Sequence, residues 1–348
     1  MREKILEIIN KESIDDKEFN EFALEIFEYE YKKNEFYRIF CDKKGKNPKN
    51  VKNFYEIPPC PQRAFKYYPL YTENIKPKYI FFSSGTTEGI KSKRYIFYPE
   101  IYNEVIYKNF KKFLLPDLEK IKIFVFFPDF EELKNSSLSY MFKKIFEKFG
   151  KKGSEYFYKN GKYLFDEFLK KIKKIDEPVA LLGTSISFYY LINYLKEKKL
   201  KIKLPENSRI LDTGGFKGLK ITINQKKLYK SYSEFLGIEE NFIVNEYGMC
   251  ELISHYYDVN LKNYFDREKI LRYKNGPCWV RWRIVDPESF EEKKEGVLIH
   301  YDLANFDSCI GVMTEDKGKK FKDGFILKGR IENSLRGCSI LSEYGKTF

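Results

Sequence analysis

Residues 81–94 read Phe-Phe-Ser-Ser-Gly-Thr-Thr-Glu-Gly-Ile-Lys-Ser-Lys-Arg and are the most informative segment of the chain. It overlaps an apolar run over 79–82 that predicts a strand, and it precedes apolar spacing over 99–114 that predicts a helix. A strand, a loop rich in glycine and hydroxyl side chains, and a helix in this order are typical of an open α/β sheet, which binds ligands at the carboxyl ends of its strands. We therefore expect an α/β fold with a ligand loop here.

The loop suits a polyphosphate. Its backbone amides and hydroxyls can surround phosphate oxygens, and Lys91, Lys93 and Arg94 would neutralise their charge. It is not a Walker A loop, because no Gly-Lys-Ser/Thr follows the first glycine at the required spacing. A solvated Ser/Thr/Gly turn is the alternative interpretation.

The composition excludes several classes of protein. An apolar content of 43% over 348 residues is enough for a large core. No run reaches the roughly 18 apolar residues of a membrane helix, and the first ten residues are amphipathic rather than a signal sequence, so we expect a cytoplasmic protein without a membrane span. The net charge is +13, but lysine alternates with glutamate and no arginine-rich patch stands out, so no nucleic-acid partner is expected.

The cysteines do not indicate a metal or disulfide framework, because no C-x-x-C pair occurs and the chain has only two histidines. The six positions are Cys41, Cys60, Cys250, Cys278, Cys309 and Cys338.

Four segments follow from the periodicity. Apolar spacing such as Ile5, Ile8 and Ile9 predicts N-terminal helices, and alternating strand and helix patterns then predict a mostly parallel sheet. After about residue 262, strand signals separated by Asn-Gly, Asp-Pro and Asp-Gly turns predict a smaller β subdomain. The expected segments are a helical segment (1–55), an α/β core (56–262), a β-rich subdomain (263–335) and a short tail (336–348). Within them we expect strands over 121–127, 179–184, 209–212, 279–285, 296–301 and 325–328, and helices over 138–149 and 187–198.

Three further motifs carry chemistry. In Asn-Glu-Tyr-Gly-Met-Cys-Glu over 245–251, Tyr247 offers a flat face for a purine and Glu251 a ligand for Mg²⁺, although a packed ring and a surface charge are the commoner outcome. In 314–330, Asp316 can accept both hydroxyls of a ribose and Arg330 can approach a phosphate, with a polar hairpin as the alternative. The loop over 212–218, Asp-Thr-Gly-Gly-Phe-Lys-Gly, lets a flat ligand lie against backbone, and it is not a G-x-G-x-x-G motif.

The order of these motifs resembles that of the adenylate-forming superfamily, which includes the acyl-CoA synthetases. Additional segments resemble the acyl-protein synthetase family, whose members include the fatty-acid-activating subunits of bacterial bioluminescence. These segments are Ile-Pro-Pro-Cys-Pro (57–61) with Phe65-Lys66, Leu-Asp-Thr-Gly-Gly (211–215), Tyr-Asp-Leu-Ala-Asn (301–305) and Arg-Gly-Cys-Ser (336–339). The resemblance covers residues from about 55 to the C-terminus.

The resemblance implies a role for each matching residue. The phosphates of ATP would be held by Ser83, Ser84, Gly85, Thr86 and Thr87 with help from Lys91. Tyr247 would stack on adenine, Gly214, Gly215 and Phe216 would form the adenine wall, Asp316 would hold the ribose with Arg330 beside it, and Glu251 would bind Mg²⁺. Residues 183–185 would flank the acyl channel. The phosphate loop departs from the usual pattern at Glu88 and Ile90, which replace a glycine and a proline.

The C-terminal tail directs attention to Cys338. A typical synthetase continues past the Gly-Arg segment into a mobile C-terminal domain that carries a catalytic lysine, and this domain is expected to be essentially absent here. In acyl-protein synthetases the activated acyl group passes to a cysteine near the C-terminus, and Cys338 matches by context. Arg336 would favour its thiolate. A small buried hydrophobe is the alternative interpretation of Cys338.

The expected function is therefore ATP- and Mg²⁺-dependent activation of a carboxylic acid, most simply a fatty acid, with transfer to Cys338. The acyl group would go on to a reductase partner or another acceptor. Two alternatives stay open at this stage, a ligase that transfers directly to a soluble thiol and a non-catalytic nucleotide-binding subunit.

Overall fold

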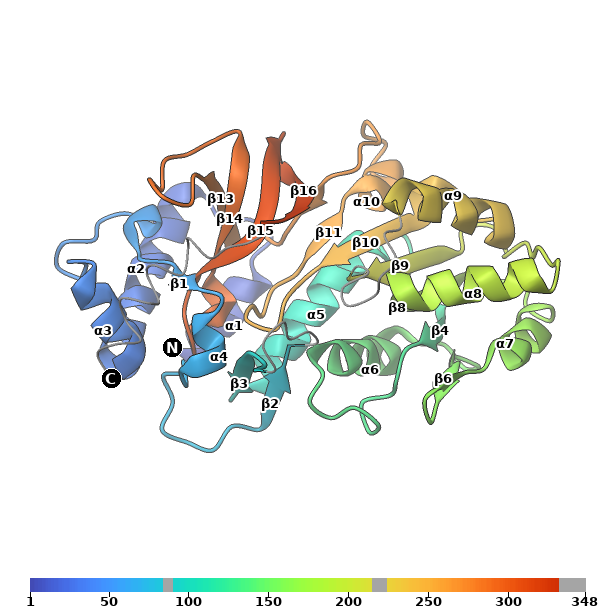
Figure 1. The fold of residues 1–348 in the computed structure, drawn as a ribbon, viewed down its shortest axis with the longest axis horizontal. Coiled ribbons are helices and arrows are strands. Elements are labelled where there is room, and N and C mark those ends of the chain that lie inside the picture. The colour runs from blue at the N-terminus through green and yellow to red at the C-terminus, as the bar shows by residue number, and fades with distance from the viewer. Residues whose placement is uncertain (84–89, 215–223, 332–348) are drawn as a thin grey trace.

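The computed structural model describes residues 1–83, 90–214 and 224–331, and in these residues one twelve-stranded sheet dominates (Figure 1). Eleven strands follow one another across it. The twelfth strand, β1 (Cys60–Pro61), is not part of this order and pairs in parallel with β15. The order is β13 (Val280–Val285), β14 (Glu295–Asp302), β15 (Gly311–Phe321), β16 (Gly324–Arg330), β12 (Lys274–Asn275), β11 (Tyr256–Asp258), β10 (Ile243–Tyr247), β9 (Arg209–Thr213), β8 (Val179–Thr184), β4 (Lys122–Phe126) and β5 (Glu155–Tyr156).

The sheet has a parallel half and an antiparallel half. Strands β5, β4, β8, β9 and β10 are parallel, and every pairing from β10 to β13 is antiparallel. The central parallel strands β8 and β9 are buried almost throughout, as expected for strands covered by helices on both faces. The mixed α/β fold predicted from the sequence is confirmed.

Helices cover both faces of the parallel half. The chain leaves β4 toward β5 but leaves β8 toward β9 in the opposite direction, so right-handed crossovers place the connecting helices on opposite faces. One face carries α8 and α9, and the other carries α5 and α6 (Figure 1). The helices are α1 (Arg2–Asn10), α2 (Asp16–Lys33), α3 (Glu35–Lys43), α4 (Ala64–Tyr67), α5 (Pro99–Phe113), α6 (Ser137–Phe149), α7 (Phe165–Ile172), α8 (Ser185–Glu197), α9 (Gln225–Leu236) and α10 (Asn260–Phe265).

Short elements complete the chain. They are the 3-10 turns η1 (Phe54–Glu56), η2 (Glu240–Phe242) and η3 (Leu303–Asn305), the hairpin of β6 (Tyr158–Lys159) with β7 (Lys162–Tyr163), and the hairpin of β2 (Tyr79–Phe82) with β3 (Lys93–Ile96).

The pairing of β2 corrects one expectation. The strand over 79–82 forms as predicted, but it pairs antiparallel with β3 and lies outside the parallel sheet. Only ten residues separate the two strands, and a connection this short returns the chain as a hairpin, whereas a parallel crossover needs a dozen residues or more. The phosphate-type loop is therefore the connection of a hairpin.

The N-terminal helices pack on the last third of the chain. Ile5, Ile8 and Ile9 are buried in the same core cluster as residues from β13 to β16. The amide of Asn34 donates to the carbonyl of Ser308 at 3.2 Å, and Arg281 donates to Asp16 at 3.0 Å. The expected division into segments at residues 55/56, 262/263 and 335/336 stays a prediction.

Across the three ranges that the structure describes, no helix has the length and apolar character needed to cross a membrane.

Candidate active site

Three of the predicted site residues meet at the junction of the two halves of the sheet. Tyr247 ends β10, and its hydroxyl donates to Oδ2 of Asp316 on β15 at 2.9 Å. Arg330 on β16 stands directly opposite Asp316 in the ladder and donates from Nε to Oδ1 at 2.7 Å. Asp316 is 8% exposed, so this carboxylate is fixed from two sides. Residues 69 positions apart in the sequence thus form one polar cluster.

The ring of Tyr247 packs against other aromatic rings. It lies at 5.8 Å from the ring of His300 and at 6.0 Å, edge to face, from Phe325. Burial lowers the pKa of His300 to about 3, so this histidine is neutral and its Nδ1 pairs with the hydroxyl of Tyr256 at 2.9 Å. The half-buried Tyr247 ring is therefore held by rings packed around it, which suits a stacking surface.

Glu251 follows this cluster in a turn and is 2% exposed. Burial raises the pKa of its carboxyl, and hydrogen bonds from the side chains of Ser92 and Gln62 oppose that effect. The charge of Arg330 also lowers this pKa, which places Glu251 within the electrostatic field of the Asp316 cluster. A buried carboxylate without a full counter-charge is the kind of group that a divalent cation stabilises.

Ser92 joins Glu251 to the base of the phosphate-type loop. The backbone amide of Ser92 donates to Oγ of Ser83 at 3.0 Å, and the amide of Ser83 donates to the carbonyl of Ser92 at 3.1 Å. The two serines therefore close the loop as an extension of the β2–β3 hairpin. Lys91 is exposed beside this closure.

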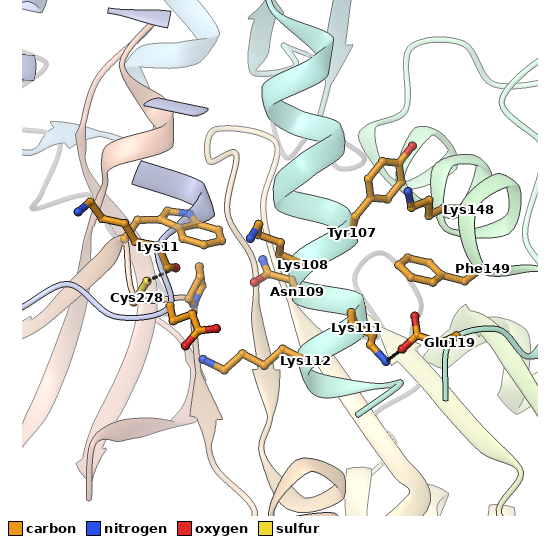
Figure 2. Close-up of a pocket in the computed structure, with 13 residues that line it drawn as sticks. Lys11, Tyr107, Lys108, Asn109, Lys111, Lys112, Glu119, Lys148, Phe149 and Cys278 are labelled. Atoms are coloured by element: carbon orange, nitrogen blue, oxygen red, sulfur yellow. Dashed lines mark hydrogen bonds and ion pairs between the residues drawn. The ribbon is translucent and has the colours of Figure 1, made fainter. Parts of the chain in front are cut away.

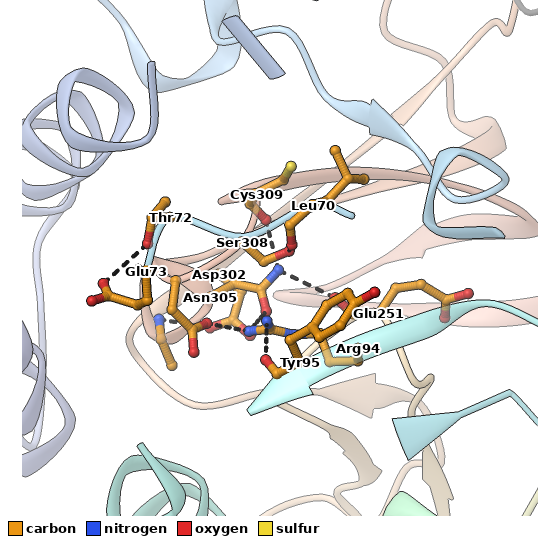
Figure 3. A network of polar contacts seen from close by, with 12 residues as sticks. Leu70, Thr72, Glu73, Arg94, Tyr95, Glu251, Asp302, Asn305, Ser308 and Cys309 are labelled. Carbon is orange, nitrogen blue, oxygen red and sulfur yellow. Dashed lines mark hydrogen bonds and ion pairs between the residues drawn. The ribbon is translucent and has the colours of Figure 1, made fainter. Parts of the chain in front are cut away.

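Arg94 was predicted to neutralise phosphate charge at the loop, but the structure places its side chain in an internal ion pair. It is 1% exposed, and its guanidinium pairs with Asp307 and donates to Oδ1 of Asn305 at 3.1 Å (Figure 3). Its charge is therefore already balanced by a carboxylate. The amide of Asn305 donates to the backbone carbonyl of Glu251 at 3.2 Å, so Arg94 supports the turn that presents Glu251.

The carboxyl end of β9 lies at a further side of the candidate active site. Gly214 has φ +72°, a conformation that favours glycine, and a side chain there would point into open space. Ser185 at the start of α8 donates to Asp212 at 2.6 Å and to the carbonyl of Gly214 at 3.3 Å. This hydroxyl ties the turn after β9 to the first turn of α8, in the segment predicted to flank an acyl channel.

His255 is a buried residue that lies beside a buried carboxylate. Its Nδ1 lies 3.2 Å from Oε1 of Glu246, and Glu246 also accepts from the hydroxyl of Thr213. The ring meets Tyr102 of α5 edge to face at 6.1 Å. Burial lowers the pKa of His255.

The described residues fit ATP and Mg²⁺. Each oxygen of Asp316 receives one hydrogen bond and keeps a lone pair for a ribose hydroxyl. No group of three potential metal ligands occurs in the described part of the chain, and Glu251 alone would supply a carboxylate. Mg²⁺ is commonly held by one or two carboxylates together with substrate phosphates and water, so this donor set suits a nucleotide-bound ion.

Several predicted residues lie outside the described ranges, namely Ser84, Gly85, Thr86, Thr87, Gly215, Phe216 and Cys338. Conversely, sequence reasoning missed Ser92, Gln62 and Asn305, which contact Glu251. Ser92 was within the loop motif, and its polarity between two lysines was the available signal. Asn305 ends the 301–305 segment that carries the family resemblance, but that segment gave it no role at the site. Nothing local marks Gln62, and both residues reach the site through strand pairing and a turn distant in sequence.

The chain is similar to known proteins over most of its length. The family described as "Acyl-protein synthetase, LuxE" matches residues 7–319. The long-chain-fatty-acid–luciferin-component ligase of Aliivibrio fischeri is 24% identical over 302 residues, which cover 84% of this chain and 77% of that protein.

Two solved structures share the fold. An open conformation of 2-hydroxyisobutyryl-CoA ligase, in complex with 2-HIB-AMP and CoA, matches with a TM-score of 0.65 at 13% identity, covering 92% of this chain and 76% of that one. A long-chain-fatty-acid-CoA ligase from Archaeoglobus fulgidus matches with a TM-score of 0.51 at 13% identity, covering 76% and 53%. Since the family match spans most of the sequence, the chain belongs to the acyl-protein synthetase family and is a ligase with the adenylate-forming fold.

Proposed function

We propose that this protein activates a carboxylic acid with ATP and Mg²⁺, releases pyrophosphate, and transfers the acyl group from the acyl-adenylate to Cys338 as a thioester. The observation that carries the proposal is the cluster of Tyr247, Asp316 and Arg330 beside the buried Glu251. A long-chain fatty acid is the preferred substrate class, because the relative from Aliivibrio fischeri is named for one.

In the first step the chain's residues would bind and orient the reactants. Asp316 would accept the ribose hydroxyls, Tyr247 would stack on the base, and the backbone at Gly214 would form the wall beside it. Glu251 would hold Mg²⁺, which would neutralise the phosphates. The substrate carboxylate would attack the α-phosphorus, and the bond from that phosphorus to the bridging oxygen of pyrophosphate would break.

In the second step the thiolate of Cys338 would attack the carbonyl carbon of the mixed anhydride. The carbon–sulfur bond would form as the carbon–oxygen bond to AMP breaks, and the thiol proton would pass to solvent. AMP is a good leaving group, and Arg336 would lower the pKa of the thiol by its charge. The thioester would then supply a reductase or another acceptor protein.

The test has two stages. The first measures carboxylate-dependent exchange of labelled pyrophosphate into ATP with fatty and aromatic acids. We expect exchange with fatty acids and its loss in Asp316→Ala, while failure of every acid would refute the ligase activity proposed for this site. The second maps hydroxylamine-sensitive label after incubation with ATP, Mg²⁺ and a labelled acid.

Label on the peptide that contains Cys338, absent in Cys338→Ser, supports the thioester. Cys278→Ser is the matched control, because Cys278 is a half-buried free thiol to which the proposal gives no role. If exchange is present but no label forms on the protein, or if Cys338→Ser leaves turnover with free coenzyme A intact, the acyl group goes directly to a soluble thiol. A label retained in Cys338→Ser would place the thioester on another residue. An outcome with ATP binding but no exchange favours a non-catalytic nucleotide-binding subunit.

A further inference from the structure

A cavity lies near the amino ends of the parallel strands, whereas the candidate active site lies at their carboxyl ends. The cavity has a volume of about 510 Å³ and is formed by the second half of α5, the end of α6, the residues after α1 and the turn before β13 (Figure 2). Its wall includes Glu119, which precedes the amino end of β4, whereas Tyr247 and Gly214 stand at carboxyl ends of strands. The volume falls in the range of small-molecule sites.

Lysine dominates the charge of this cavity. Five lysines and two glutamates line it. Lys111 donates to Glu119 at 2.6 Å and Lys11 pairs with Glu18 at 2.8 Å, so these two ammonium groups are balanced. Lys108, Lys112 and Lys148 have no ion pair with any described residue. Against the remaining carboxylate of Glu12, these three leave an excess of two positive charges.

The buried amide of Asn109 lines the same cavity. Asn109 is 1% exposed, and neither Oδ1 nor Nδ2 has a hydrogen-bond partner among the described residues. Leaving a buried amide unpaired is unfavourable for the fold, and native structures rarely retain such groups without a reason. A ligand that offers both a donor and an acceptor would satisfy it.

The lysine positions alone have a simpler explanation. Lys111 and Lys112 belong to the last turn of α5, where cations favour the helix dipole. The same explanation covers Lys148 in the last turn of α6, but it accounts neither for Lys108 nor for the unpaired amide of Asn109. The aromatic rings of Phe149 and Trp279 also line the cavity.

We propose that this cavity binds a small phosphorylated organic compound. A phosphate carries nearly two negative charges and several acceptor oxygens, which matches the excess charge and the three ammonium groups of Lys108, Lys112 and Lys148. A carboxylate would balance only half of that charge. The organic part of the ligand would lie against the rings, since the cavity is much larger than a phosphate needs, and a shift of the surrounding side chains would bring it to the buried amide of Asn109.

The chain provides its own reporter for this site. It has two tryptophans, and only Trp279 lines the cavity, so Trp282→Phe leaves a single fluorophore there. In that background we would titrate inorganic pyrophosphate and ADP at several salt concentrations. We expect a saturable change in Trp279 fluorescence that weakens with salt, because the contacts are electrostatic.

Substitutions in and outside the cavity test whether the probes bind there. Lys108→Gln combined with Lys148→Gln should weaken binding at least tenfold, while the exposed pair Lys226→Gln and Lys227→Gln on α9 should leave it unchanged. Asn109→Leu should weaken ADP binding yet raise the melting temperature, because it removes the unpaired amide. A melting temperature that falls would show that Asn109 is structural and would count against the proposal.

The outcome of this test can be distinguished from the outcome of the test of the ligase proposal. Asp316→Ala should abolish exchange and leave the fluorescence titration intact. The cavity proposal is overturned if neither probe gives saturable binding, or if binding survives the double lysine variant. It is also overturned if poly-glutamate binds with the same lysine dependence and the phosphate compounds do not, since that would indicate a surface for an acidic protein.

Discussion

Asp212 provides a quantitative test of the electrostatics beneath the candidate active site. Its carboxyl group is fully enclosed at the end of β9. Burial raises its pKa from 3.8 to about 7, although hydrogen bonds from Ser185 at 2.6 Å and Tyr232 at 3.0 Å lower it. Among the charged groups nearby, Lys274 lowers this pKa and Asp258 raises it.

The sign of the effect on stability follows from where the proton is bound. Between about pH 4 and pH 7 the folded protein keeps a proton on Asp212 that the unfolded chain has lost, so the free energy of unfolding falls as pH rises through this window. Each pH unit is equivalent to about 1.4 kcal/mol. From pH 5 to pH 7 this one carboxyl group should therefore lower the stability by about 2 to 3 kcal/mol.

The substitution Asp212→Asn removes the titration and keeps the shape. Its carbonyl can accept from Ser185 and its amide can donate to the hydroxyl of Tyr232. Urea denaturation of both proteins at pH 5, 6, 7 and 8, at fixed ionic strength, gives the stability difference at each pH. We expect the variant to gain about 2 to 3 kcal/mol relative to the native protein between pH 5 and pH 7.

A stability difference that does not change with pH would refute the reasoning. Asp302, whose pKa burial raises to about 6, contributes equally to both proteins and cancels. Tyr232→Phe is a second check. It removes a hydrogen bond that favours the ionised carboxylate, so the pH-dependent loss should extend to higher pH than in the native protein.

Three other substitutions test the site and its support. Tyr247→Phe keeps the ring but removes the donor to Asp316, and it should raise the KM for ATP about tenfold in the exchange assay, with kcat less affected. Ser92→Ala should raise the Mg²⁺ concentration needed for half-maximal exchange, and an unchanged Mg²⁺ dependence would argue against its contact with Glu251. Arg94→Met leaves Asp307 buried without its partner and should cost about 3 to 5 kcal/mol in denaturation, most of which the double variant with Asp307→Leu should restore.

The parallel half of the fold was predictable because its strands are continuous apolar runs. The strand over 179–184 forms with the predicted bounds, the one over 121–127 is shorter by one residue at each end, and the one over 209–212 is longer by one residue at its end. The long strand β15 was not predicted. Its residues alternate between buried and exposed but include glycines and charged side chains, and its pairing with β1, β14 and β16 depends on distant segments.

Some residues of the candidate site could likewise be recognised from the local sequence, and others could not. The motif around Tyr247 and the Asp316–Arg330 segment could be recognised locally, and the structure brings these residues together through the ladder between β15 and β16. The role of Arg94 could not be found locally. Its partner Asp307 is 213 positions away, and burial rather than sequence context decides that its charge belongs to an internal ion pair.

The contacts between the N-terminal helices and the last third of the chain have a consequence during synthesis. Asn34 and Ser308 are 274 positions apart, and Arg281 and Asp16 are 265 apart. At ribosomal rates of about 5 to 20 residues per second, roughly 15 to 50 s pass between the synthesis of α1 and α2 and that of the distant segments that contact them. These two helices are synthesised well before the distant segments that complete their burial, so the nascent chain is an expected client for chaperones that shield hydrophobic helices.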